Sequence, residues 1–351
     1  MSSPLLATPG AVPAEGPDAG VAAHYGDPVR EQRAMTRAAG LVDRSHRGVV
    51  RVAGPDRLSW LHSLTTQHLE KLTAAATARA LILSPNGHVE QELTLTDDGT
   101  AAWIHVEPGR AAPLVEFLDS MRFMLRVETA DLTAGYAVLT VAGPSGAEAA
   151  AAAAGAAVAV TDGLVGTDYV VPRTELATIA GEVGDRGARL AGTWAYEALR
   201  IAAHEARFGL DTDHKTLPHE VGWITPAVHL SKGCYRGQET VARIHNLGHP
   251  PRRLVLLHLD GSVDRLPAHG APITTGDGAQ VGFVGSAARH FELGPIGLGL
   301  VKRSVPTEAT LLADGVAAAQ EVIVPPDAGA NVRVTLRRDS VPQPPAGRKM
   351  L

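Results

Sequence analysis

The stretch Ser231–Thr240, which reads SKGCYRGQET, contains the only cysteine of the chain. Lys232 and Arg236 lie two residues to either side of Cys234. Neighbouring cations favour the thiolate, the form of cysteine that acts as a nucleophile or as a metal ligand. A lone cysteine is otherwise commonly a small buried hydrophobic residue. The charged and polar neighbours favour a loop that presents a functional thiol.

The fold prediction starts from this stretch. The pattern Lys-Gly-Cys-Tyr-x-Gly-Gln-Glu, complete here over 232–239, resembles the signature of the YgfZ-type folate-binding proteins, relatives of the glycine-cleavage T-protein (aminomethyltransferase). Similarity extends to GLVDRSHRGVVRVAGPDRLSWLHSLTTQHLEKL at 40–72 and to RRLVLLHLDG at 252–261. It covers the chain from about Tyr25 to about Pro325. The resemblance implies an α+β, T-protein-like multidomain fold with antiparallel sheets, helices and a C-terminal β-barrel domain.

The same resemblance implies a protein that binds tetrahydrofolate or another reduced folate and supports the assembly or repair of iron–sulfur cluster enzymes. Cys234 would be its reactive thiol, ionised with help from Lys232, which we expect to be exposed in the loop. The other motif residues would shape this loop or position a partner: Gly233, Tyr235, Gly237, Gln238 and Glu239. The implied partners are folate and iron–sulfur client or assembly proteins, and no resident metal is expected.

Two positions depart from the T-protein pattern. T-proteins carry an acidic pair in the hairpin after the turn that corresponds to Asn86-Gly87, and use an acid there in chemistry at the folate nitrogen. This chain has Gln91-Glu92 instead. T-proteins also read Arg-x-Glu where this chain has Arg200-Ile201-Ala202, so a carboxylate expected at the amino edge of the pterin is missing. An edge without an acceptor binds less tightly.

These departures and the cysteine favour the YgfZ-type interpretation. The competing enzyme hypothesis is a folate-dependent aminomethyltransferase or demethylase, which turnover of a methylated amine with tetrahydrofolate would reveal. A third hypothesis is a module that only delivers or senses folate. Whether the protein catalyses a reaction is left open.

Trp194, Tyr196 and Arg200 are the residues expected to contact the folate. They share one predicted helix that leads toward the cysteine loop. A pterin or aminobenzoyl ring needs a flat apolar partner, which an aromatic side chain supplies. Aromatic residues on an apolar helix face otherwise belong to the core, so both interpretations of Trp194 and Tyr196 remain open.

The composition is that of an ordinary soluble protein large enough for two or three domains, with 351 residues, 45% hydrophobic and 20% charged. A formal net charge of −5 gives no basic footprint, so we expect neither a nucleic-acid partner nor a membrane partner. One cysteine excludes an internal disulfide and a cysteine-only zinc or cluster site, and indicates a reducing, cytoplasmic location. The first two dozen residues lack the features of a secretory signal.

Hydrophobic patterning predicts the order of the units. The run at 78–84 and the alternating run at 89–96 predict a hairpin about the turn at 85–87. After Pro250-Pro251, short glycine-punctuated strands are typical of a small barrel. The predicted division is a disordered tail at 1–24, an α+β domain at 25–145, a second α+β segment at 146–250 ending in the cysteine loop, a barrel at 251–340 and a frayed tail at 341–351.

Two other kinds of site are weaker hypotheses. A metal site would draw on Asp211 or Asp213, His214 and His219. No HExxH motif or His/Cys pair at ligand spacing supports it. A Cys–His hydrolase would pair Cys234 with His245 or His219, but no protease-type signature surrounds the cysteine.

Overall fold

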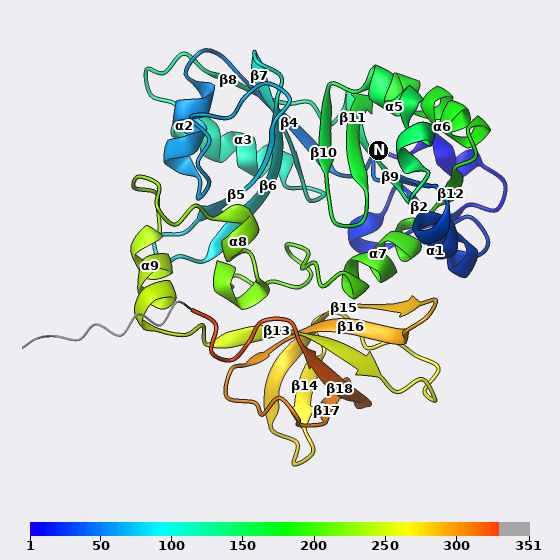
Figure 1. Cartoon of the computed structure of the whole chain (residues 1–351), viewed down its shortest axis with the longest axis vertical. Helices are drawn as coiled ribbons and strands as arrows, with labels where there is room; N and C mark the ends of the chain where they lie inside the picture. The colour runs from blue at the N-terminus through cyan, green and yellow to red at the C-terminus, as the bar shows by residue number, and fades with distance from the viewer. Residues whose placement is uncertain (330–351) are drawn as a thin grey trace, which may run out of the picture.

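The computed structural model describes residues 1–329, which form an α+β protein with three bodies (Figure 1). Two five-stranded sheets lie side by side, and a closed six-stranded barrel lies below them in Figure 1. The predicted fold class, with antiparallel sheets, helices and a C-terminal β-barrel, is confirmed. None of the helices described combines the length and the apolar character needed to cross a membrane.

The first sheet, on the left in Figure 1, has the strand order β5-β6-β7-β4-β8 and is antiparallel throughout. Its strands are β4 (Gly48–Ala53), β5 (Thr77–Leu83), β6 (Val89–Asp97), β7 (Ala101–Val106) and β8 (Glu128–Asp131). The helices α2 (Arg57–Leu64) and α3 (Ala111–Ser120) bury Leu61 and Leu114 in the core of this half. The predicted hairpin is β5-β6, whose turn holds Gly87 at φ +80°.

The second sheet has the order β10-β11-β9-β3-β12, with β12 parallel to β3. Its strands are β3 (Gly40–Asp43), β9 (Tyr136–Ala142), β10 (Ala159–Asp162), β11 (Thr167–Pro172) and β12 (Arg189–Ala191). Its helices are α1 (Pro28–Arg37), α4 (Gly146–Ala149), α5 (Ala151–Ala156), α6 (Leu176–Asp185), the short η3 (Arg173–Glu175) and α7 (Thr193–Ala202). Because β3 precedes the first sheet and β9 follows it, the chain begins the second sheet, builds the first and then returns.

The barrel follows the order β13-β16-β15-β14-β17-β18. Its strands are β13 (Arg252–Leu259), β14 (Pro272–Thr275), β15 (Gln280–His290), β16 (Gly294–Lys302), β17 (Leu311–Ala313) and β18 (Val316–Val322). Glycine is needed at Gly282, where an added Cβ would collide with the backbone of Leu300 on the neighbouring strand. Helix α7 packs against β15 of the barrel, so this helix joins the second sheet to the barrel.

The N-terminal residues differ from the prediction. Instead of a disordered tail at 1–24, they form η1 (Pro4–Ala7), β1 (Val12–Pro13), η2 (Gly16–Asp18) and β2 (Ala22–His24). Val21, Ala22 and Ala23 are at most 2% exposed, and β2 packs on α7. The small residues of this segment give it the composition of a flexible tail. In the structure, the same small residues allow close packing of the backbone. The predicted frayed tail at 341–351 lies outside the described residues.

The connection after α7 carries short helices rather than remaining without structure. It contains η4 (Pro218–Val221), α8 (Ile224–Ala227) and α9 (Gln238–Leu247). Two residues of the cysteine motif, Gln238 and Glu239, form the first turn of α9. The motif is therefore a loop that ends in a helix, placed beside the first sheet (Figure 1).

Candidate functional site

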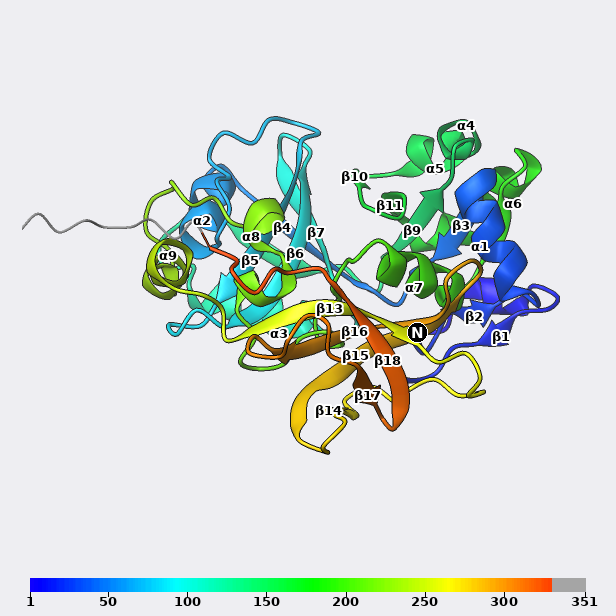
Figure 2. The same cartoon turned by 60° about the horizontal axis from the view of Figure 1, so that its bottom comes forward.

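A cavity of about 1040 Å³ lies between the two sheets and the connection that leads to the barrel. Figure 2 shows these parts from another side, with the two sheets on either side of the connecting segment. The volume is at the upper end of the range of small-molecule pockets. Its ionisable lining residues are Asp18, Arg44, His46, Arg47, His68, Arg79, Glu92, His105, Glu107, Asp162, Asp168, Tyr196, Glu197, Arg200, His204, Glu205 and Arg207.

These ionisable lining residues form what we call the charged wall, and Arg207 lies at its centre. Its Nε donates to Glu107 Oε2 at 2.7 Å, and its Nη2 donates to Asp18 Oδ1 at 2.7 Å. Its Nη1 donates to Glu197 Oε1 at 3.2 Å. Because Asp18 belongs to the N-terminal segment, this ion pair makes that segment a part of the cavity wall.

Two carboxylates of this wall, Asp18 and Glu107, are ionised at neutral pH. Burial alone would raise the pKa of Asp18, but hydrogen bonds from His46 and Arg207 hold the pKa far below its ordinary range. Burial likewise opposes ionisation of Glu107, and the charges of Arg47 and Arg207 overcome it and hold its pKa far below the ordinary value. At these two positions the wall thus carries fixed negative charges.

Tyr196, one of the predicted folate contacts, lines the cavity beneath Arg44. The guanidinium carbon of Arg44 lies 4.2 Å from the centroid of the Tyr196 ring. Arg44 also donates to both oxygens of Asp168 at 3.0 Å, which fixes the guanidinium over the ring. Burial raises the pKa of the Tyr196 phenol, partly opposed by Arg44, so the hydroxyl stays protonated.

Arg200, also a predicted folate contact, lines the cavity but is engaged by protein acceptors. It donates to Glu197 at 2.6 Å, to Asp211 at 2.9 Å and to Ser286 Oγ at 2.7 Å. Ser286 lies in β15, so Arg200 fastens α7 to the barrel. A direct contact between Arg200 and folate stays a prediction.

Trp194 is placed differently from the other two predicted contacts. Its side chain is 56% exposed and its ring is tilted against His24 at a centroid distance of 5.0 Å. It is not among the residues that line this cavity. The tryptophan in the lining is Trp223, which lies beneath the guanidinium of Arg79 at 5.0 Å. The predicted contact of Trp194 stays untested, and Trp223 is an aromatic wall that the sequence analysis missed.

Arg79 holds two carboxylates in the cavity. Its Nε donates to Glu92 Oε1 at 2.9 Å, and its Nη1 contacts Glu205 Oε1 at 2.5 Å. Burial raises the pKa of Glu205, and Arg79 opposes this rise. Glu205 comes three residues after Ala202, so the cavity contains a carboxylate close in sequence to the one missing at 202. Of the hairpin pair, Glu92 lines the cavity and Gln91 does not.

His105 is a neutral hydrogen-bonding group of this wall. Its Nδ1 accepts from Arg47 Nε at 3.2 Å, which places the proton on Nε2. Among the described residues Nε2 has no hydrogen-bond partner, and Asp168 Oδ2 is 3.5 Å away. Burial, aided by Arg47, lowers the pKa of His105 to about 3. The Nε2–H is thus a buried donor beside the cavity.

The cysteine loop supplies no residue to the cavity lining. Cys234 is exposed and free. Lys232 differs from the expectation of an exposed cation, since it is only 6% exposed. Its ammonium donates to the carbonyl oxygens of His62 and Thr65 at the end of α2, where helical carbonyls lack intrahelical partners. Burial lowers its pKa to about 8. Its observed contacts fasten the loop to α2.

The two motif glycines have different roles. Gly237 has φ +81°, and a Cβ there would lie 2.5 Å from the carbonyl oxygen of Ser84 in the β5-β6 turn. Gly233 has open space around the corresponding position. Only Gly237 is therefore required by its backbone conformation and by close approach.

The remaining motif residues hold the loop together. The ring of Tyr235 is 8% exposed, and the Lys232 ammonium lies 5.1 Å from its centroid. Gln238 Nε2 donates to the Lys232 carbonyl at 3.3 Å. Arg236, beside the cysteine, pairs with Glu90 of the hairpin at 3.1 Å. These contacts leave the thiol exposed on a tethered loop.

The weaker hypotheses gain no support from the geometry. Asp211 is paired with Arg200, and Asp213 is paired with Arg252 at 2.7 Å. His219 is buried, 6.1 Å from His245 between ring centroids, whereas Cys234 is exposed. The acidic ligands of the predicted metal site are thus already neutralised by arginines.

Sequence reasoning missed most of the charged wall. Arg44, Arg79 and His105 come from separate strands and loops, and Glu205 and Arg207 come from the connection after α7, so the five form no local motif. The sole signal was the presence of polar side chains inside otherwise apolar strands, such as His105 in β7.

Comparisons with known proteins identify one matching family model and several similar sequences. Residues 21–162 match the model of the GCVT N-terminal domain. An aminomethyltransferase of Symbiobacterium thermophilum is 28% identical over 295 residues, which are 74% of this chain and 77% of that protein. A chloroplastic "putative transferase" of Arabidopsis thaliana is 27% identical over 292 residues, 73% of this chain but only 65% of the plant protein.

One solved structure is similar over nearly the whole chain. The glycine cleavage system aminomethyltransferase T from Bartonella henselae superposes with a TM-score of 0.78 at 20% identity. The match covers 92% of this chain and 96% of that one. At this identity the likeness establishes a shared fold.

Proposed function

Because the chain carries a GCVT N-terminal domain and has the fold of an aminomethyltransferase T-protein, we propose that it binds a reduced folate in its central cavity. We further propose that it supports assembly or repair of iron–sulfur enzymes in the cytoplasm, as a YgfZ-type protein. The observation that carries the folate proposal is the cavity of about 1040 Å³, in which flat side chains and carboxylates face the same space.

The lining suits the parts of a folate. The amino edge of a pterin presents N–H donors, and Glu92 and Glu205 provide acceptors within the cavity. Tyr196 and Trp223 provide flat surfaces against which an aromatic ring can pack.

The iron–sulfur role rests on the cysteine motif. Cys234 is exposed, and the loop that carries it is fixed to α2 through Lys232. This arrangement supports a thiol available to a protein client outside the cavity. Recognition of folate and chemistry at the thiol would then be separate tasks of separate residues.

A second candidate, aminomethyl transfer to folate, is favoured by one observation. Glu92 stands in the cavity on the hairpin where T-proteins use an acid. Glu92 pairs with Arg79, so the hairpin still presents one carboxylate to the cavity although the neighbouring position is Gln91. Formation of a one-carbon folate from an aminomethyl donor or a methylated amine would establish this activity, and its absence would leave the accessory role.

Calorimetric titration with tetrahydrofolate under anaerobic conditions tests the binding site. We expect one site per chain, and we expect Glu205→Gln to weaken binding about 10- to 100-fold, as for the loss of a hydrogen bond to a charged group of about 1.5–3 kcal/mol. Glu182→Gln is the matched control, because Glu182 is exposed on α6. No binding heat and no rise in melting temperature at millimolar folate would refute the proposal.

Complementation tests the role of the thiol. In cells that lack the protein, Cys234→Ala should fail to restore iron–sulfur enzyme activity, while the purified variant binds tetrahydrofolate as tightly as the unmodified protein. Full complementation by this variant would remove the thiol role. Only the hypothesis of a folate delivery or sensing module would then remain.

A further inference from the structure

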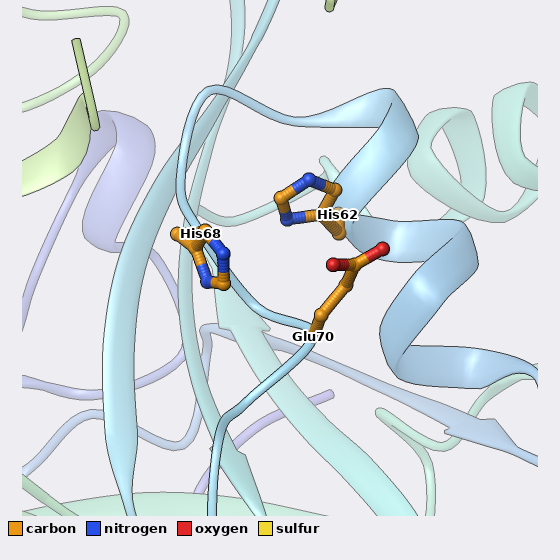
Figure 3. Close-up of side chains that lie close together, drawn as sticks. All are labelled: His62, His68 and Glu70. Atoms are coloured by element: carbon orange, nitrogen blue, oxygen red, sulfur yellow. The ribbon is translucent and has the colours of Figure 1, made fainter. Parts of the chain in front are cut away.

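Two histidines and a glutamate gather at the end of α2, where His68 also borders the cavity (Figure 3). His62 lies in the last turn of α2, and His68 and Glu70 follow in the loop. One potential ligand atom from each of the three side chains lies within 4.8 Å of those of the other two. Figure 3 shows the three side chains directed toward a common space.

We propose that His62, His68 and Glu70 bind a divalent first-row transition metal ion. Two imidazoles and one carboxylate form the donor set of sites that hold Fe(II) and related ions with coordination positions left open. Imidazole nitrogen also suits zinc, cobalt and nickel, so the donor set selects a class of ion rather than one element. Glu70 is exposed and the histidines are half-buried, so an ion can enter from solvent.

A third histidine borders the cluster. The ring of His229 lies 5.3 Å from that of His68, which itself lies 4.8 Å from the ring of His62. His229 comes from the segment that leads into the cysteine motif, and its backbone N–H donates to the Thr66 carbonyl at 2.9 Å. It is placed to approach a bound ion as an additional ligand.

The loop that carries His68 is held firmly, which a binding site requires. Thr66 Oγ1 donates to the Ala227 carbonyl at 2.6 Å, and the Thr66 N–H donates to the Leu81 carbonyl at 3.0 Å. Leu69, between the two loop ligands, is fully buried. The ligands therefore project from a backbone anchored to β5 and to the end of α8.

Binding of a metal ion requires the loss of one hydrogen bond at His62. Its Nδ1 accepts the Leu69 N–H at 3.3 Å, a long hydrogen bond. A metal at Nδ1 would displace that N–H, and a metal at Nε2 would place the proton on Nδ1, so either way this one bond is lost. The nearby Lys232 ammonium is already held by two carbonyl oxygens, and the Glu70 carboxylate offsets its charge.

Cobalt provides the test, because Co(II) has visible bands that report ligand number and geometry. Chain without a histidine tag is stripped with a chelator and titrated with Co(II), with calorimetry using Zn(II) in parallel. We expect one ion per chain, and at least a 10-fold loss of affinity in both His68→Ala and Glu70→Gln. His229→Ala should shift the visible bands if this residue completes the site.

His214→Ala is the matched control, since His214 is exposed and distant in sequence from the cluster. It should bind Co(II) as the unmodified chain does, and circular dichroism should show all variants folded. Absence of saturable binding, or equal affinity in the unmodified chain, His68→Ala and Glu70→Gln, would overturn the proposal. The result is independent of the proposed function, because tetrahydrofolate affinity is measured separately on the same variants.

Discussion

Replacement of Arg207 by methionine tests whether the charged wall holds the N-terminal segment and the two sheet bodies together. Methionine fills a similar volume but removes the guanidinium that bridges Asp18, Glu107 and Glu197. The Arg207 side chain is 8% exposed, and its carboxylate partners are 10–14% exposed. Each partner would lose a neutralising charge inside the protein.

The expected cost follows from burial. Breaking a buried ion pair by removing one partner costs about 3–5 kcal/mol. Arg47 still neutralises Glu107, and Arg200 still neutralises Glu197, so the loss does not multiply with the number of partners. For a chain of this size about 1 kcal/mol lowers the melting temperature by roughly 2 °C. We therefore expect a decrease of about 6–10 °C for Arg207→Met.

Arg126→Met is the matched control. Arg126 also pairs with an aspartate at 2.7 Å, but its side chain is 74% exposed. An exposed pair contributes about 0–1 kcal/mol, so the melting temperature should change by at most about 2 °C. Differential scanning calorimetry of both variants without folate provides the measurement. Equal small changes in the two variants would refute the argument that the wall is a structural bridge.

The pH dependence gives a second check on the same variant. The pKa values of Asp18 and Glu107 are depressed in the folded protein from ordinary values of 3.8 and 4.5. Stability from such groups is present above the ordinary values and is lost as pH falls through the folded values. The difference in melting temperature between the unmodified protein and Arg207→Met should therefore narrow below about pH 4.5. A constant difference from pH 7 to pH 3 would contradict this assignment.

Three further predictions concern Gly237, Lys232 and His219. Gly237→Ala should lower the melting temperature by several degrees because of its positive φ and the nearby Ser84 carbonyl, whereas Gly233→Ala should have little effect in the same calorimetric scan. Lys232→Met leaves two carbonyl oxygens without their donor and should be destabilising by about 2 kcal/mol or more in urea, in contrast to the exposed control Lys71→Met. Burial lowers the pKa of His219 to about 4, below the ordinary 6.5, so the unmodified protein loses stability as pH falls from 6.5 toward 4. His219→Phe should be less sensitive over that range, and parallel melting profiles would exclude this explanation.

The fold could be predicted because its signals are local. The alternation before and after Asn86-Gly87 specifies a hairpin, and β5-β6 forms there. Glycines among short apolar runs indicated the barrel, which closes as six strands. The prediction of a disordered N-terminal tail was wrong, because Val21–Ala23 are small enough to pack fully against α7. Composition alone does not separate these cases, because close backbone packing and flexibility both favour small residues.

The candidate site could be predicted only in part. Tyr196 and Arg200 line the cavity, since one helix carries both and a helix keeps such neighbours together. Arg79 and Arg207 are isolated charges in the sequence, and only the arrangement of the two sheets brings both into the lining of one cavity. Lys232 was expected beside the thiol because the two are close in sequence, yet its long side chain reaches the end of α2. Sequence proximity fixes the Cα atoms, and packing decides where the charged atom lies.

The β5-β6 hairpin connects the cavity and the cysteine loop. One strand carries Glu92 into the cavity, and the turn at Gly87 rests against Gly237 of the motif. Glu90, between them on β6, pairs with Arg236 beside the cysteine. A substitution in this hairpin therefore alters both places, since they share one backbone. Loss of iron–sulfur support in such a variant can be assigned to the thiol only when folate affinity, measured on the same protein, is unchanged.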